Sequence, residues 1–440
     1  MTSNITGSAD ALRAANLAFA QRYPGEAGAR QPVHTVYGGA QLFAHDSTRK
    51  LGDIALRALR EYAPDAATLG AALGIANHPA LDTIYARLTE KLEREPVEDF
   101  RIDFEDGYGN RPDAEEDGHA IAVAEALAKG MKDGTLPPFI GMRIKPLNEE
   151  LRARSTRTLD LVLTELVKRA GALPENFVIT VPKIVILEQV EYIVAELGRI
   201  EQKLQLPAGS LRFEVMVETP QIVLDSEGRS LLPRIPAVSE GRLTAAHFGT
   251  YDYTAGVNIT AAHQRMRHPA CDFAKHVMQV SLAGTGVWLS DGSTTVMPVP
   301  IHRGASLTPE QRAENRASVH SAWKLHFDDI THSLVGGFYQ GWDLHPAQIV
   351  TRYAALYAFF LDGIDAAANR LSNFVSKAAQ ATLVGDVFDD AATGQGLLNF
   401  FLRGVNSAAI TEEDAVAMTG LSVDELRGRS FVKIMKNRTA

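Results

Sequence analysis

The chain has 440 residues, 45% of them hydrophobic and 22% charged, which is the composition of a globular protein with enough apolar residues for a large core. The 44 basic and 53 acidic side chains give a formal net charge of −9, which argues against a nucleic-acid partner because nucleic acids bind basic surfaces. A single cysteine, no signal-like N-terminus and no apolar stretch of membrane-spanning length predict a cytoplasmic protein without disulfides or a membrane partner.

The first hundred residues predict an arm, one strand and a helical region. Residues 1–32 are small, polar and mixed, and we expect an N-terminal arm there with a helix from about residue 11 to 23. The first strand is expected at 34–37, where two glycines end the run. Apolar residues then recur at helical spacing over 47–94, with breaks near Pro64 and Pro79.

From residue 100 onward, short apolar runs alternate with helical patterns. The runs have the length of buried strands, and turn residues or charged residues end each of them. They lie at 100–104, 139–144, 177–181, 213–217, 243–248, 287–289 and 337–340.

Eight such strands with helices between nearly all of them predict an α/β fold, a closed (β/α)₈ TIM barrel. A dinucleotide-binding sheet is disfavoured, because no Gly-x-Gly-x-x-Gly follows the first strand. The expected domain organisation is an N-terminal arm at 1–32, the barrel at 33–362 and a helical C-terminal extension at 363–440.

Charged residues stand at the predicted C-terminal ends of the strands. The βα loops of a parallel barrel open on that edge, and the chemistry of such barrels lies there. Acids suit a hard divalent cation, whereas an arginine and a lysine suit a substrate that carries a carboxylate. The set consists of Glu105, Asp106, Arg143, Lys183, Glu218, Asp252, Asp291 and His345.

Glu218 and Asp252 are the candidate metal ligands. Each follows an apolar run and precedes turn residues, and their separation of 252 − 218 = 34 residues is about one βα unit, so we expect them on adjacent strands. Two carboxylates at neighbouring strand ends can reach one Mg²⁺ (or Mn²⁺) ion. The alternative is that Glu218 caps the next helix and Asp252 closes a turn.

Six ordered motifs, each at a predicted strand end, carry a resemblance to a known superfamily. They are Ile102-Asp103-Phe104-Glu105-Asp106, Met142-Arg143-Ile144, Val181-Pro182-Lys183-Ile184, Val217-Glu218-Thr219, Gly249-Thr250-Tyr251-Asp252 and the segment from Gly337 to Gln348. Over about residues 33–360 the chain resembles the citrate lyase β-subunit and HpcH/HpaI aldolase superfamily of phosphoenolpyruvate/pyruvate-type barrels.

The resemblance implies roles for individual residues. Glu218 and Asp252 would bind Mg²⁺, and Arg143 would bind the substrate's oxygens and stabilise the charge that develops on them. Lys183 and Thr219 would complete the substrate site. Two further catalytic residues, Glu105 and Asp106, would hold the water ligands of the metal. In relatives the general acid or base can come from the tail of a neighbouring subunit, which implies a homo-oligomer and points to Asp389 or Asp390.

The implied function is a Mg²⁺-dependent carbon–carbon lyase, or the reverse condensing enzyme, that acts on a small 2-oxo or 2-hydroxy acid through a metal-stabilised enolate. Several positions depart from the family pattern: Gln41 and Trp342 replace a family arginine and lysine, Lys145 replaces an asparagine, and Pro220 replaces an alanine. These departures leave open whether the substrate is the free acid or its coenzyme A thioester.

Other interpretations of the same residues remain. Lys183 could act as a Schiff-base lysine in a metal-independent aldolase, or the barrel could bind a metabolite without turning it over. Arg143 could pair with Asp103 or Glu105 as a buried ion pair, and His345 is expected to be a packed histidine. The apolar residues between 397 and 402 predict that the extension covers a barrel mouth, with a neighbouring subunit as the expected cover.

Overall fold

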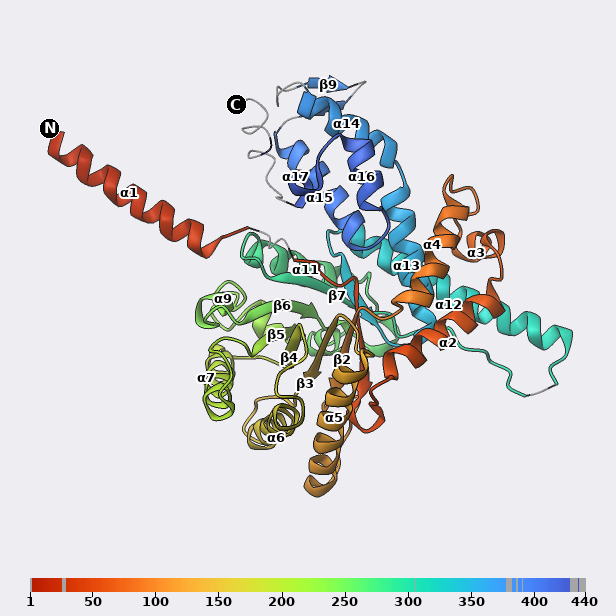
Figure 1. Ribbon diagram of the computed structural model, residues 1–440, viewed down its shortest axis with the longest axis horizontal. Helices are drawn as coiled ribbons and strands as arrows, with labels where there is room; N and C mark the ends of the chain where they lie inside the picture. The colour runs from red at the N-terminus through yellow and green to blue at the C-terminus, as the bar shows by residue number, and fades with distance from the viewer. Residues whose placement is uncertain are drawn as a thin grey trace.

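A computed structural model describes residues 2–25, 29–304, 306–376, 382–384, 387–389, 391–427 and 434. Eight parallel strands form a closed barrel in the order β1 to β8, with β8 paired to β1 (Figure 1). The predicted (β/α)₈ fold is therefore confirmed. The strands are β1 (His34–Gly39), β2 (Asp99–Asp103), β3 (Phe139–Arg143), β4 (Phe177–Val181), β5 (Arg212–Val217), β6 (Leu243–Phe248), β7 (Trp288–Ser293) and β8 (Gln340–Asp343).

Helices surround the barrel and bury one apolar face against it. In α7, for example, Val190, Ile193 and Leu197 recur at helical spacing and are fully buried. The helices of this layer are α2 (Ser47–Tyr62), α3 (Ala66–Leu73), α4 (Leu81–Arg94), α5 (Asp113–Asp133), α6 (Arg152–Ala170), α7 (Leu187–Leu204), α8 (Pro220–Val223), α9 (Ile235–Val238), α10 (Thr250–Gly256), α11 (Pro269–Leu282), α12 (Pro309–Val335) and α13 (Pro346–Leu361).

The last strand lies three residues further along the chain than its predicted range of 337–340. The reason is the end of α12: Phe338 donates its backbone N–H to the carbonyl oxygen of Ser333 at 2.8 Å, and Gly337 has φ +84°, so these residues close the helix. The strand β8 then begins at Gln340. The strand β7 is also longer than predicted and ends at Ser293.

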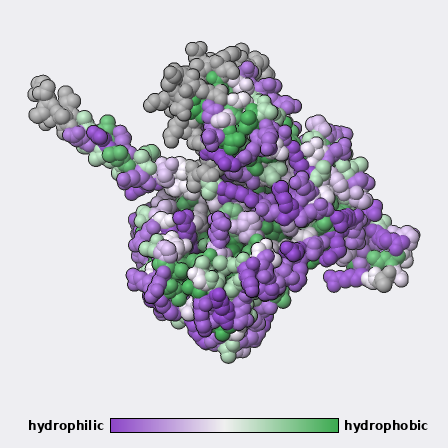
Figure 2. Space-filling model, viewed as in Figure 1, coloured by the Kyte–Doolittle hydropathy of each residue, from purple (hydrophilic) through white to green (hydrophobic). Residues whose placement is uncertain are grey.

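The N-terminal arm is a helix, α1 (Thr2–Arg22), which extends away from the rest of the molecule (Figures 1 and 2). It starts well before the predicted residue 11. Among the described residues, no helix has both the length and the apolar character that crossing a bilayer requires.

The C-terminal extension packs on the barrel of its own chain. It contains α14 (Ile364–Ser376), the short hairpin β9 (Thr382–Val384) and β10 (Val387–Asp389), α15 (Ala391–Asn406), α16 (Glu412–Thr419) and α17 (Val423–Arg427). The ring of Phe400 lies 5.3 Å from that of Phe360 on α13. Leu398 and Phe401 are fully buried.

Helices of the same chain, and not a neighbouring subunit as expected, bury Leu398, Phe401 and Leu402, whereas Leu397 and Phe400 are partly buried. The extension also contacts the opposite end of the barrel from the predicted site. Arg403 donates to the side chain of Gln31, which precedes β1, and stacks on Tyr339, which precedes β8. Asp389 ends β10, and Asp390 lies outside the described residues.

Candidate functional site

The predicted site residues meet at the C-terminal edge of the barrel. Strand pairing places Asp103 beside Arg143 at the ends of β2 and β3, and Val217 beside Phe248 at the ends of β5 and β6. Glu218 follows directly after Val217, and Asp252 lies in the first turn of α10, just beyond β6. The two acids are thus on adjacent βα units, as their spacing predicted.

Glu218 is a buried carboxylate with a raised pKa. Its Oε1 accepts the backbone N–H of Lys183 at 2.8 Å, and Thr219, not Glu218, is the N-cap residue of α8. Burial, helped by the carboxylate of Asp252 and opposed by the charge of Arg143, raises the pKa of Glu218 to about 7. Gly249 makes room for this side chain, because a Cβ there would lie 2.5 Å from the Cβ of Glu218.

Asp252 completes the acidic pair from the solvent side. Its side chain is 44% exposed, and its Oδ1 lies 3.8 Å from Nζ of Lys183. Burial raises the pKa of Asp252, with Asp106 adding to the shift, although Lys183 and Arg143 act in the opposite direction. The pair therefore consists of one enclosed and one accessible carboxylate, both of which resist ionisation.

Arg143 is buried and held by a bidentate ion pair. Its Nε and Nη2 donate to the two carboxylate oxygens of Asp103 at 2.7 and 2.5 Å, and its Nη1 lies 3.2 Å from Oε2 of Glu105. The guanidinium also lies over the rings of Tyr37 and Trp342, at 4.9 and 5.6 Å from their centroids. The ion pair that was the alternative interpretation of Arg143 is thus present, and Arg143 places a fixed positive charge beside the acids.

Lys183 links the acids through an unusual backbone conformation. Its φ of +52° lies in the left-handed region, which costs a non-glycine residue of order 1–3 kcal/mol. This conformation aims its N–H at Glu218, while its ammonium pairs with Glu105 and lies 3.2 Å from Asp106. Although burial acts to lower it, the pKa of Lys183 is raised by Glu105 and the other acids, so the side chain is a cation.

Glu105 and Asp106 lie between the two cations, Arg143 and Lys183, and their pKa values are shifted in opposite directions. Burial raises the pKa of Glu105, despite the charge of Arg143. Burial acts to raise the pKa of Asp106 as well, but the contact with Glu105 and the charges of Lys183 and Arg143 outweigh it and lower that pKa. Environments that separate the pKa values of two neighbouring acids are typical of sites that move protons.

Three further sequence candidates have structural partners. Thr219 donates its hydroxyl to the carbonyl oxygen of Ile184 at 2.5 Å and so ties the ends of β4 and β5 together. Asp291 accepts from Lys275 of α11 at 3.0 Å, away from the acidic pair. His345 accepts the N–H of Ala347 at 3.1 Å and caps α13, as expected of a packed histidine.

The donors present suit a hard divalent cation. Glu218 and Asp252 offer carboxylate oxygens, which Mg²⁺ prefers, and burial raises the pKa values of both despite the charges of Arg143 and Lys183, so the pair has a deficit of positive charge. A divalent cation would remove that deficit. Within the described residues no group of three or more His, Cys, Asp and Glu side chains is placed to hold a metal. The candidate site offers two carboxylate ligands, Glu218 and Asp252.

The raised pKa of Glu218 predicts a pH-dependent stability in metal-free protein. The carboxyl group of Glu218 binds its proton more tightly in the folded protein than in the unfolded chain. Its contribution to the free energy of unfolding is therefore complete below the ordinary pKa of 4.5 and is lost as the pH rises to about 7. This interval corresponds to about 3 kcal/mol. The free energies of unfolding of the wild-type protein and of Glu218→Gln can be measured with a chelator at low and high pH. The wild-type value should fall relative to that of the variant as the pH rises, because glutamine does not ionise. A constant difference would show that Glu218 ionises normally.

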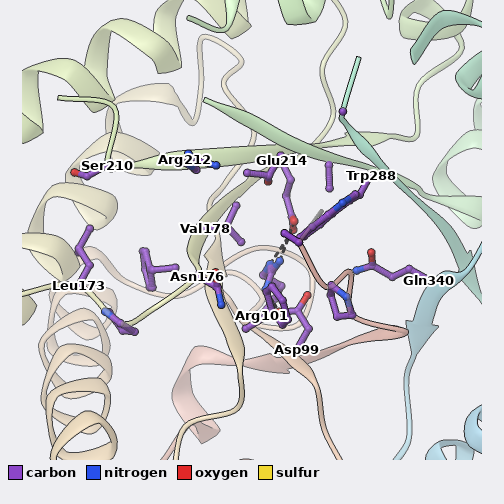
Figure 3. A pocket seen from close by; sticks show the side chains of 18 residues that line it. Asp99, Arg101, Leu173, Asn176, Val178, Ser210, Arg212, Glu214, Trp288 and Gln340 are labelled. Atoms are coloured by element: carbon purple, nitrogen blue, oxygen red, sulfur yellow. Dashed lines mark hydrogen bonds and ion pairs between the residues drawn. The ribbon is translucent and has the colours of Figure 1, made fainter. Parts of the chain in front are cut away.

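A cavity of about 550 Å³ opens at the other, N-terminal end of the barrel (Figure 3). The first residues of several strands line it, among them Asp99, Phe139, Arg212, Trp288 and Gln340. Active sites of such barrels lie at the C-terminal end instead, where the acidic pair is. We therefore place the chemistry at the acidic pair rather than in this cavity.

Three charged groups of the cavity, Asp99, Arg101 and Glu214, satisfy one another. Arg101 donates to both oxygens of Glu214 at 2.8 Å and also pairs with Asp99 (Figure 3). Behind them, Nε2 of His247 lies 3.0 Å from Glu214. The sequence did not predict this network. Glu214 and His247 lie inside apolar runs, and only the alternation of strand side chains, which turns every second residue into the barrel, could have indicated it.

Comparisons with known proteins agree with the fold. A citrate lyase from Burkholderia xenovorans LB400 has a TM-score of 0.58 and 18% identity, over 89% of this chain and 97% of that one. A Haloferax volcanii malate synthase complex with magnesium and glyoxylate has a TM-score of 0.48 and 14% identity, over 91% and 98%. CitE from Mycobacterium tuberculosis, with magnesium, acetoacetate and coenzyme A, has a TM-score of 0.47 and 13% identity, over 90% and 100%.

The similarity to the Burkholderia citrate lyase confirms the predicted resemblance at the level of the fold. No curated protein matches the sequence. A family model described as a domain of unknown function (DUF6986) matches residues 12–434, which is nearly the whole chain. The chain therefore belongs to the DUF6986 family.

Proposed function

We propose that the protein is a Mg²⁺-dependent carbon–carbon lyase, or the reverse condensing enzyme, for a small 2-oxo or 2-hydroxy acid or its coenzyme A thioester. The observation that supports it is the pair Glu218 and Asp252, which lies at the catalytic edge of the barrel beside two cations, Arg143 and Lys183. Acids that resist ionisation suit a metal, and cations beside them suit an anionic substrate.

Each residue has a role in this proposal. Glu218 and Asp252 would hold the cation, which when bound supplies Lewis-acid stabilisation of an enolate oxygen. Arg143, fixed by Asp103, contributes positive charge where the enolate's negative charge develops. Lys183 holds Glu105 and Asp106 in place, and its charge favours the binding of a carboxylate. Glu105 and Asp106 would accept hydrogen bonds from the cation's water ligands.

Proton exchange in heavy water tests this function without knowledge of the natural substrate. An enzyme that stabilises the pyruvate enolate should exchange the methyl protons of pyruvate for deuterium, and NMR detects the exchange directly. We expect exchange with Mg²⁺ and none after chelation. The same assay with oxaloacetate, malate and acetyl-coenzyme A as additional compounds defines the substrate class. Exchange that persists in the chelator would contradict the metal's role.

The state of Lys183 predicts that no Schiff base forms. Imine formation requires a neutral amine, but the surrounding acids raise the pKa of this lysine and hold its ammonium in ion pairs. Treatment with borohydride in the presence of pyruvate should therefore leave the peptide that carries Lys183 unmodified in a mass spectrum. A reduced pyruvate adduct on that peptide would replace the metal mechanism with the aldolase alternative.

A further inference from the structure

The arm α1 leaves apolar side chains without cover. Every described side chain from residue 8 to 22 is exposed, and Leu12 and Phe19 expose 61% and 64% of their surface. Figure 1 shows the helix extending away from the barrel, and Figure 2 shows apolar residues along it. A helix in water draws most of its stability from packing one face on a neighbour, and the barrel offers no such neighbour along residues 8–22.

A second uncovered apolar stripe lies on the outer face of α11. Cys271, Ala274 and Met278 on its inner face are fully buried in the barrel. On the outer face, Phe273 is 50% exposed and Val280 is 83% exposed, with Val277 between them. We call Phe273, Val277 and Val280 the α11 stripe.

The C-terminal end of the arm is anchored just beyond the C-terminal end of α11, and the arm leads away from there. The backbone N–H of Gly25 donates to the carbonyl oxygen of Gly284 at 2.9 Å, and Gly284 lies two residues beyond the end of α11. Tyr23 packs against the same glycine. From this anchor α1 runs outward, so the arm does not cover the stripe of its own chain (Figure 1).

We propose that α1 docks on the α11 stripe of a second copy of this chain, and that the second copy returns the same contact. The spacing matches: Leu12 and Phe19 are seven residues apart, as are Phe273 and Val280, with the small Ala15 facing Val277. The arm's 21 residues span about 31 Å and the 14 residues of α11 about 21 Å, so the arm covers the whole stripe.

Symmetry fixes the direction of the docked arm. A two-fold axis that passes beside the Gly25–Gly284 contacts of the two copies brings the C-terminal end of α1 next to the C-terminal end of the partner's α11. The two helices therefore run parallel. Phe19 then meets Val280, and Leu12 meets Phe273. Each copy supplies one arm and one stripe, so the same contact is made twice. The surface area buried in the dimer is therefore twice that of a single arm on a single stripe, which brings it closer to the area of stable dimers.

Light scattering on matched variants tests the interface. The wild-type chain should be a dimer at micromolar concentration, and Leu12→Asp/Phe19→Asp should weaken dimerisation roughly a hundredfold or more, because two large apolar side chains per arm lose their contacts. Ala14→Asp/Gln21→Asp adds the same charges at the same spacing on the opposite face of α1 and should leave the dimer intact. A monomeric wild-type chain, or equal effects of the two variants, would overturn the proposal.

Cysteine cross-linking tests the direction and the partner. The single native cysteine, Cys271, is buried, so new surface cysteines are the reactive ones. Leu12→Cys/Phe273→Cys should oxidise to a covalent dimer. A disulfide within one chain would show that the arm folds back on its own stripe, and a dimer formed by Leu12→Cys alone would show that two arms pair with each other. Either result, or no disulfide at all, would overturn the proposal.

Discussion

Replacing Asp103 with alanine should lower the free energy of unfolding by about 3–5 kcal/mol, which is the cost of leaving one member of a buried ion pair alone. Asp103 and Arg143 are both nearly inaccessible to solvent and share two hydrogen bonds. Asp103 also accepts the backbone N–H groups of Glu105 and Gly107 at 2.9 and 2.8 Å, so its removal leaves four N–H donors, two of them on Arg143, without their acceptor. Denaturant unfolding measures the change.

A surface ion pair provides the control for this prediction. Glu93 and Arg60 lie 3.1 Å apart, and both are more than half exposed. Glu93→Ala should change the stability by no more than about 1 kcal/mol, because water screens such pairs. An Asp103→Ala variant as stable as Glu93→Ala would show that Arg143 does not depend on its partner, and the account of a fixed cation in the site would fail.

Glu218→Gln and Asp252→Asn should each abolish turnover and weaken Mg²⁺ binding by at least about a hundredfold, since the loss of an outer-shell partner alone costs 10–100-fold. Both substitutions keep the shape of the side chain and remove the charge that a cation requires. In Glu218→Gln the amide oxygen of the new side chain can still accept the N–H of Lys183, so the fold should be kept. Titration calorimetry with Mg²⁺ gives the affinity, and the pyruvate exchange assay gives the activity.

Asp291→Asn is the matched control for the metal ligands. Asp291 was predicted at a strand end but lies inside β7, and its carboxylate faces Lys275 and Ser333 in the helix layer. This variant should lose stability, because it breaks a buried ion pair, yet bind Mg²⁺ as the wild-type chain does. A loss of Mg²⁺ affinity equal to that of Glu218→Gln, in folded protein, would show that the acids at this edge act through their total charge and not as ligands.

The sequence was sufficient to predict the barrel because its strands are short apolar runs with clear ends. Phe177–Val181 and Leu243–Phe248 have the predicted bounds, since a charged or glycine-containing turn follows each of them. The range of β8 was wrong because the aromatic residues Phe338 and Tyr339 have strand-like propensity but belong to the turn that closes α12. Local propensity cannot distinguish these two uses.

The position of the candidate site was predictable, and the ion pair of Arg143 with Asp103 was among the alternatives, but the geometry of the contacts was not predictable. Glu218 and Asp252 were placed on adjacent units from their spacing and their strand ends. The bidentate pair of Arg143 with Asp103 depends on which strand-end side chains turn toward each other, and the conformation of Lys183 depends on a positive φ that its residue type does not favour. The cover of the C-terminal apolar residues depends on long-range packing on α13, which no local pattern encodes.

Diffraction from crystals soaked in Mn²⁺ tests the central claim most directly. Mn²⁺ replaces Mg²⁺ at oxygen sites and scatters anomalously, so its position is found without assumptions about the substrate. The soak should be made near pH 8, above the pKa of about 7 at which Glu218 ionises. We predict an anomalous peak within bonding distance of both Glu218 and Asp252. Crystals that show no peak at this pair would contradict the metal assignment and, with it, the proposed mechanism.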